Sequence, residues 1–181
     1  MDPRYTIALA RPEHVALLPE IERAAGELFR GRVALSLLND TTDETDLREA
    51  QAAGHLWVAL CGDAPVGFAV VELLAPDLPH LEEIDVHPEH GRRGIGAALV
   101  HAVADWASRA RHEELTLTTF RAIPWNMPFY ARLGFEELRP ESLRPELVAV
   151  VADEAARGLD PAERVVMRLR LPFERAGGAK R

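Results

Sequence analysis

Residues 81–100 read LEEIDVHPEHGRRGIGAALV, and this stretch decides the fold. The first six residues, apolar and acidic, predict a strand over Leu81–Val86. A loop rich in glycine and arginine follows, and apolar residues at helical spacing then predict a helix over Gly94–Arg111. A strand that passes through a glycine-rich loop into a helix is a common setting for an anion-binding site.

The loop carries the residues that such a site needs. The first N–H groups of a helix have no partner inside the helix, and the helix dipole gives them partial positive charge. Gly94 and Gly96 have no Cβ, so a phosphate can approach the backbone closely. Arg92 and Arg93 add charge that can pair with phosphate oxygens. The sequence therefore predicts a pyrophosphate cradle at this junction.

The glycine spacing separates three kinds of phosphate loop. A dinucleotide fold of the pattern G-x-G-x-x-G would place glycine where Leu99 stands, and the Gly-Lys-Ser/Thr of a P-loop is absent. The stretch instead resembles motif A of the GNAT superfamily, the acyl-CoA-dependent N-acyltransferases, which is written Gln/Arg-x-x-Gly-x-Gly/Ala. Gly94 and Gly96 fit its glycines, and the strand end at Val86 fits the segment that leads into it. The first position of the motif falls on Gly91, so an arginine after it is expected to supply the charge.

Composition limits the protein classes that remain. The 181 residues are enough for one domain, expected over residues 1–175 with a frayed tail at 176–181. The net charge of −8 argues against a nucleic-acid-binding domain, and no apolar run approaches a membrane span. The N-terminus lacks a signal-peptide pattern, so a cytoplasmic protein is expected. Cys61, the single cysteine, excludes an internal disulfide and is interpreted as a structural residue at a strand end.

The whole chain predicts a mixed α/β fold, in which a largely antiparallel sheet is flanked by helices. Strands are expected over Tyr5–Ala10, His55–Leu60, Val66–Leu74, Leu81–Val86, Leu115–Thr119, Phe135–Leu138 and Val165–Leu171. Helices are expected over Pro12–Phe29, Asp46–Ala53, Gly94–Arg111, Asn126–Leu133 and Pro145–Arg157. This order is also that of the GNAT fold, so the resemblance spans nearly the whole chain and is sharpest from Leu81 to Phe135.

A second segment extends the resemblance. Phe129-Tyr130-Ala131-Arg132-Leu133-Gly134-Phe135 is similar to the helix and Gly-Phe that recur in GNAT proteins. The resemblance implies that Tyr130 protonates the departing CoA thiolate, a role that a phenol can fill. The alternative is a structural tyrosine that packs on its ring and bonds a backbone carbonyl.

A general base is needed because an amine is mostly protonated at neutral pH. In a regular strand Glu83 and Asp85 share one face, and Glu82 lies on the other. Glu83 matches the acidic position that often faces the acceptor in relatives, and it is the preferred base. Glu82 is the second candidate, because a β-bulge would exchange the faces. The positions at which other relatives carry a base hold Thr118 and Thr119, which cannot serve.

The resemblance also implies a site for acetyl-CoA. The strand backbone over Ile84, Asp85 and Val86 would align the pantetheine arm, and an N–H near Val86 would polarise the thioester carbonyl. The pyrophosphate would lie on the backbone amides of Arg92, Arg93, Gly94, Ile95, Gly96 and Ala97. Asn126 is expected to be a helix N-cap, a cofactor contact or both, since the position that usually holds the family's asparagine is Ile123.

The predicted function is N-acetyl transfer from acetyl-CoA to a primary amine, by direct attack in a ternary complex. A non-catalytic acyl-CoA-binding or sensing module on the same fold is the alternative, and a nucleotide-using enzyme is a more distant one. No metal is expected, because the histidines lack ligand spacing. Trp125 is a core or rim aromatic, or a wall of the acceptor pocket. The insertion from Arg139 to Arg164 is expected to shape that pocket or a dimer interface, so a homodimer is one expectation.

Overall fold

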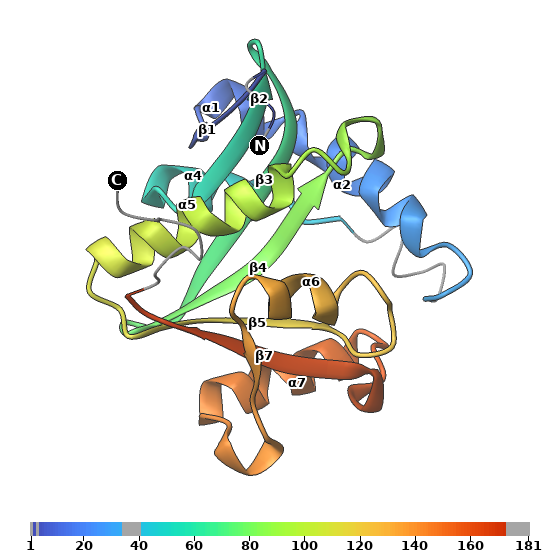
Figure 1. Cartoon of the computed structure of the whole chain (residues 1–181), viewed down its shortest axis with the longest axis vertical. Coiled ribbons are helices and arrows are strands. Elements are labelled where there is room, and N and C mark those ends of the chain that lie inside the picture. Colours follow the sequence, from blue (N-terminus) through green and yellow to red (C-terminus); the bar gives the residue numbers. More distant parts are fainter. Residues whose placement is uncertain (1, 3, 34–40, 173–181) are drawn as a thin grey trace, which may run out of the picture.

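The computed structural model describes residues 2, 4–33 and 41–172 of the chain. Its centre is a seven-stranded sheet in the order β1-β2-β3-β4-β5-β7-β6, with helices on both faces (Figure 1). Every neighbouring pair of strands is antiparallel except β4 and β5, which are parallel. The predicted mixed sheet flanked by helices is confirmed. The tail expected at 176–181 lies outside the described residues.

Strands β1–β4 form an antiparallel meander. Their bounds are Tyr5–Leu9, Leu56–Cys61, Ala64–Ala75 and Leu78–Val86. A short turn at Gly62 joins β2 to β3, as a glycine with a positive φ allows. Cys61 is the last residue of β2 and is half-buried, in agreement with its predicted place at a strand end.

The predicted helix over Pro12–Phe29 is divided in the structure. α1 covers Pro12–Val15, α2 covers Leu18–Gly26, and a 3₁₀ turn, η1, follows over Glu27–Phe29. Pro19 explains the break, because proline has no N–H to continue the first helix and is well placed in the first turn of the second. α4 follows over Glu44–Ala53 and ends at Gly54 in the left-handed conformation.

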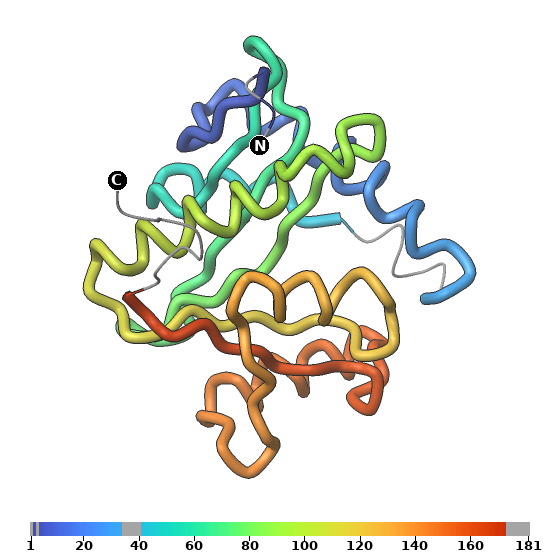
Figure 2. The backbone as a smooth tube through the Cα atoms, in the orientation of Figure 1, coloured from blue at the N-terminus to red at the C-terminus, as the bar shows by residue number. Residues whose placement is uncertain are grey.

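The crossover between the parallel strands is α5, over Ile95–Arg109. It leads to β5 over Glu114–Phe120, α6 over Met127–Arg132 and the two-residue strand β6 over Glu136–Glu137. A 3₁₀ turn η2 over Pro88–His90 precedes α5. The chain then forms η3 over Pro140–Ser142, α7 over Pro145–Ala156, η4 over Pro161–Glu163 and β7 over Arg164–Arg170. β7 runs beside β5 (Figure 2), and its other edge pairs with β6.

Two main cores fill the two faces of the sheet. On one face, α5 buries Leu99 and Val103 among residues of β2–β5 and β7, and α6 packs Phe129 and Tyr130 against the same cluster. On the other face, α1, α2 and α4 bury residues against Phe68 and its neighbours. No described helix is long and apolar enough to cross a bilayer.

A smaller third core belongs to the inserted segment. Leu147 of α7 is buried with Leu78 of β4 and Val166 of β7. Glu154, about two turns further along α7, forms a buried ion pair with Arg164 of β7. The insertion is therefore packed on the sheet and contributes to its core.

Candidate active site

The site begins where β4 and β5 separate. The parallel pairing joins only His80 to Thr116 and Leu81 to Leu117, although both strands continue for several residues (Figure 1). Beyond Leu81 the side of β4 that faces β5 has no strand partner among the described residues. The sheet therefore contains an open gap with unpaired backbone groups along one side.

The β3–β4 register shows which groups face the gap. The His87 N–H donates to the Val66 carbonyl at 2.9 Å. Bonded and non-bonded pairs alternate in an antiparallel ladder, so the Asp85 backbone is used in pairing with β3. The N–H groups of Ile84 and Val86 turn away from β3 and toward the gap. The Ile84 N–H already donates to the Glu83 carboxylate at 3.1 Å. Of the three residues expected to align pantetheine, Val86 is therefore the one that offers a free backbone donor there.

The loop before α5 has the backbone shape of an anion cradle. Gly94 is the N-cap in the left-handed conformation, with φ 77°, and no side chain caps the helix. Arg92 also has a positive φ of 59°, which is uncommon for a residue with a side chain. The first N–H groups of this 15-residue helix are thus left for a ligand or solvent.

Gly96 lies where the helix approaches the gap. A Cβ built on Gly96 would lie 3.4 Å from Cζ of Phe129 and 4.0 Å from a methyl of Val86. The missing side chain therefore leaves space between the start of α5, the end of β4 and α6.

The two arginines of the loop differ in their contacts. Arg93 donates to the Tyr5 hydroxyl and, at 3.2 Å, to the Glu89 carbonyl, so it holds the loop against β1. Arg92 is exposed and has no hydrogen bond or ion pair with a described residue. Arg92 is therefore the arginine that remains for a phosphate.

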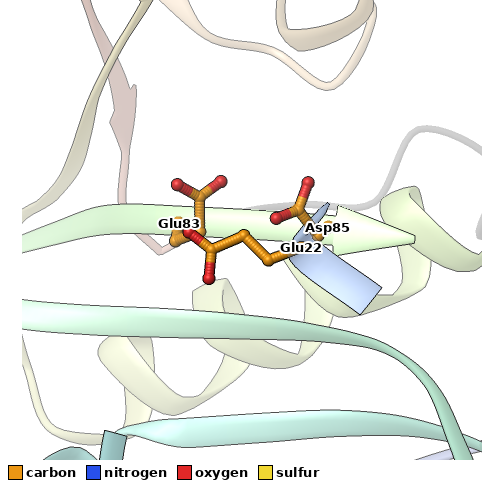
Figure 3. A group of neighbouring side chains, drawn as sticks. All are labelled: Glu22, Glu83 and Asp85. Carbon is orange, nitrogen blue, oxygen red and sulfur yellow. The ribbon is translucent and has the colours of Figure 1, made fainter. Parts of the chain in front are cut away.

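Three carboxylates meet on the face of the sheet covered by α2. Glu22 of α2 and Glu83 and Asp85 of β4 each place an oxygen within 4.8 Å of the others (Figure 3). Burial first, and the Glu22 charge second, raise the pKa of Glu83 to about 7. Burial and the Glu83 charge raise the pKa of Asp85 well above its ordinary value. A carboxyl with a pKa near 7 can serve as a general base at neutral pH.

A β-bulge lies at Glu82. Val70 is opposite Glu83 and Val71 is opposite Leu81, so Glu82 is the extra residue of β4. The bulge precedes Glu83, and Glu83 and Asp85 still share the face with Glu22. Glu82 is exposed. Its side chain is not part of the cluster of three carboxylates.

Tyr130 approaches the gap from the opposite face. Its ring packs edge-on against Phe129 and Phe135, with centroids 5.0 and 5.7 Å away. The hydroxyl has no hydrogen-bond partner among the described residues, so the backbone carbonyl bond of a structural tyrosine is not found there. Burial, followed by the charges of Glu83 and Asp85, raises the pKa of Tyr130. The phenol therefore keeps its proton at neutral pH and can donate it or a hydrogen bond.

Asn126 stands at the N-cap position of α6, but its side chain does not cap the helix. Its Nδ2 instead donates to Thr119 Oγ1 at 3.0 Å, which ties the loop before α6 to β5. Its backbone carbonyl accepts from the N–H groups of Phe129 and Tyr130. Asn126 thus positions the segment that carries Tyr130.

The loops beside α2 and β5 form an open pocket. Its lining residues are Gly31, Arg32, Phe120, Ala122, Ile123 and Glu163. Trp125 is 42% exposed near it, with the Arg32 guanidinium 4.8 Å from the ring centroid and Phe29 6.2 Å away. Glu163 comes from the insertion, so the end of the insertion does contribute to this pocket.

The three carboxylates could offer oxygen ligands to a cation, but acidic clusters of this kind are common without one, and no other feature of the described residues points to a cation here. No cation site is assigned to them. Glu22 is the site residue that the sequence did not reveal. It lies on a helix far from β4 in the chain, and its only sequence signal is a charged position on an amphipathic helix.

Comparison with known proteins places these features in a family. The model of the "Acetyltransferase (GNAT) family" matches residues 20–135, which include most of α2, the β4–α5 junction and α6. Human N-acetyltransferase 8 is 28% identical over 130 residues, which are 68% of this chain and 56% of the human protein. The chain thus spans about half the length of the curated relatives it matches.

Two solved structures share the fold. A GNAT-family acetyltransferase from Staphylococcus aureus has a TM-score of 0.69 at 16% identity, covering 92% of this chain and 99% of its own. The PaiA N-acetyltransferase from Thermoplasma acidophilum, solved in complex with coenzyme A, has a TM-score of 0.66 at 15% identity. The comparison covers 92% of this chain and 98% of that one.

Proposed function

Because the chain belongs to the acetyltransferase (GNAT) family, we propose that it transfers an acetyl group from acetyl-CoA to a primary amine. The observation that carries the proposal is the gap between β4 and β5. It is bordered by the unpaired Val86 N–H of β4 and by the N-terminus of α5, and the charges of Glu83 and Asp85 act on the pKa of Tyr130 there. Residues 1–175 are proposed to form a single domain of this kind.

Acetyl-CoA supplies the activated acetyl group as a thioester. The β4 backbone over Ile84, Asp85 and Val86 would bind its pantetheine arm as a neighbouring strand would, with the Val86 N–H as the free donor because the Ile84 N–H is bonded to Glu83. The Val86 N–H is suited to stabilise negative charge on the carbonyl oxygen during attack. The amides of Arg92, Arg93, Gly94, Ile95, Gly96 and Ala97 would hold the pyrophosphate, with the Arg92 side chain beside them.

The proton steps are assigned to Glu83 and Tyr130. Glu83 would take the proton of the amine, directly or through one water, because its pKa of about 7 leaves it partly ionised at neutral pH. The amine nitrogen then forms a bond with the acetyl carbon as the C–S bond breaks. Tyr130 would stabilise or protonate the departing thiolate, and its raised pKa keeps the needed proton on the oxygen.

The test has two parts. Calorimetric titration with CoA and acetyl-CoA measures binding, and a library of primary amines is then screened for release of free thiol. Binding with amine-dependent thiol release supports the proposal. Binding without turnover for any amine would favour the acyl-CoA-binding module, and no binding would contradict both.

A further inference from the structure

Glu22 is held firmly beside the proposed base by the segment that precedes α4. The Thr42 N–H donates to both carboxylate oxygens of Glu22, at 3.0 and 3.1 Å, and the Thr42 hydroxyl donates to one of them at 3.1 Å. Its neighbour Ile21 and Ala25, one turn later, are buried in the core. The carboxylate is thus fixed by α2 on one side and by Thr42 on the other.

The position of Glu22 has an electrostatic consequence. A half-buried carboxylate close to another disfavours ionisation of its neighbour, because like charges repel strongly when water is partly excluded. Glu22 is the largest charge effect on the pKa of Glu83, and it also raises the pKa of Asp85. The hydrogen bonds from Thr42 hold the Glu22 carboxylate in this position.

Building on the acetyltransferase activity proposed above, we propose that Glu22 is a positioning residue that sets the proton affinity of the base. Its carboxylate, fixed by Thr42 against Glu83 and Asp85, makes Glu83 a stronger base than an isolated glutamate. Such a base can accept a proton from an ammonium group near neutral pH, where a carboxylate with the ordinary pKa would be a weak acceptor.

Other groups that are charged or can be ionised also lie near Glu83. Glu82 and Asp85 come from its own strand, Arg164 from β7, and the neutral Tyr130 from α6. Arg164 favours the ionised form, but its guanidinium is paired with Glu154. The bond from the Ile84 N–H to Glu83, at 3.1 Å, also favours ionisation. Burial and the Glu22 charge outweigh the effects of Arg164 and the Ile84 N–H, so the pKa of Glu83 is raised.

The decisive variant is Glu22→Gln, which removes the charge but keeps an oxygen for Thr42. In a profile of kcat/KM against pH, the apparent pKa of the acid limb should fall by about 1 pH unit, since Glu83 would ionise more readily. Glu22→Asp keeps the charge and should move the limb much less. Glu20→Gln is the matched control, because it removes the same charge from an exposed position on α2. An acid limb that stays in place in Glu22→Gln would overturn the proposal.

A second measurement works without turnover. In protein labelled with ¹³C at the glutamate carboxyl, NMR can follow Glu83, whose signal is assigned by its loss in Glu83→Gln. With excess EDTA present, its pKa should be lower in Glu22→Gln than in the parent and unchanged in Glu20→Gln. An equal pKa in parent and Glu22→Gln refutes the role of Glu22 whatever the enzyme acetylates. A lowered pKa in a protein that acetylates no amine would instead support the electrostatic role and count against the proposed function.

Discussion

Tyr130 combines features that a purely structural tyrosine does not need. Its ring is packed between two phenylalanines, while its hydroxyl has no hydrogen-bond partner among the described residues. The residue is half-buried, and its hydroxyl is not among the buried polar atoms without a partner, so this oxygen remains accessible to solvent or to a ligand. Such a hydroxyl is easier to understand if a ligand completes its hydrogen bonding.

Tyr130→Phe is the test of this interpretation. Ring packing should survive, and stability should change little or rise slightly because the lost hydroxyl has no protein partner. The value of kcat should fall by about 10- to 10³-fold, while the Kd for acetyl-CoA stays nearly constant. Steady-state kinetics and calorimetry check both quantities. Unchanged turnover, with chemistry shown to be rate-limiting, would remove Tyr130 from the mechanism.

Glu83 and Glu82 form a natural pair for testing the base. Glu83→Gln should lower kcat by about 10²-fold or more at neutral pH, because the amine loses its proton acceptor. The loss should shrink at high pH, where the amine deprotonates unaided. Glu82→Gln changes the same charge one residue away, on an exposed side chain, and should remain active. The opposite pattern would assign the base to the bulge residue.

Among the site residues, the sequence predicted only those that lie in or next to the recognised motifs. It identified Glu83 as the base candidate and the shared face with Asp85, because strand alternation is local. The partner Glu22 depends on how α2 crosses β4, which no spacing in the chain encodes. Asn126 shows the same difference: its N-cap position follows from the local pattern, but its bond to Thr119 depends on the loop shape.

The start of α5 provides a test in which stability and binding should change in opposite directions. Gly96 is helical and has no positive φ, so alanine fits the backbone and removes the entropy penalty of glycine. The new Cβ would make ordinary contact with Phe129, at 3.4 Å, but would occupy the space beside β4. Gly96→Ala should therefore raise stability by about 0.5–1 kcal/mol and weaken CoA binding.

Thermal unfolding and calorimetric titration with CoA measure the two effects. Gly96→Val is the stronger version for binding, but its branches would press on Phe129 and are expected to lower stability. If Gly96→Ala binds CoA as well as the parent, the cradle assignment is wrong at this position.

α7 joins the sheet through a buried ion pair. Arg164 contacts Glu154 through two bonds, at 2.6 and 2.9 Å, with both side chains less than 10% exposed. Glu154→Gln would leave the guanidinium buried without a counter-charge, and we expect a loss of about 3 kcal/mol. Chemical denaturation of the parent and of Glu154→Gln measures this loss of unfolding free energy. In the double variant with Arg164→Gln the loss should be smaller than the sum of the two single losses, and strict additivity would mean that the pair is not coupled.

Element boundaries were predictable where the chain carries its own stop signals. α4 ends at Gly54, and β2 and β3 meet at Gly62, as the sequence indicates. The N-terminal helix was predicted as continuous because its apolar face is continuous, whereas Pro19 restarts it. The separation of β4 from β5 was not predicted, because strand pairing depends on contacts between distant segments.

Across the whole molecule, the proposed site should make stability depend on pH. The folded protein keeps a proton on Glu83 up to about pH 7, while the unfolded chain loses it near 4.5. The folded state therefore binds more protons in this window, so the Glu83 contribution lowers stability as the pH rises through it. His80 acts in the opposite sense, because burial lowers its pKa to about 4 and stability is lost as the pH falls from 6.5.

A comparison of the parent with Glu83→Gln isolates the first effect, since both retain His80. Relative to the parent, the variant should become more stable as the pH is raised from 4.5 to 8, and the difference should level off above pH 7. Denaturant unfolding at several pH values provides the measurement. A difference that is constant across this range would show that Glu83 ionises normally in the folded protein.

The unpaired half of β4 also bears on how the protein avoids association. An open strand edge is a template for pairing with another chain, and here such an edge occurs inside the sheet, not only at its borders. Its unpaired half carries the exposed Glu82 and the half-buried Glu83 and Asp85, and the Glu83 carboxylate accepts a bond from the Ile84 N–H. Charged side chains discourage edge-to-edge pairing. The acidic residues proposed to prepare the acceptor would thus also keep the open edge from recruiting a second strand and starting aggregation.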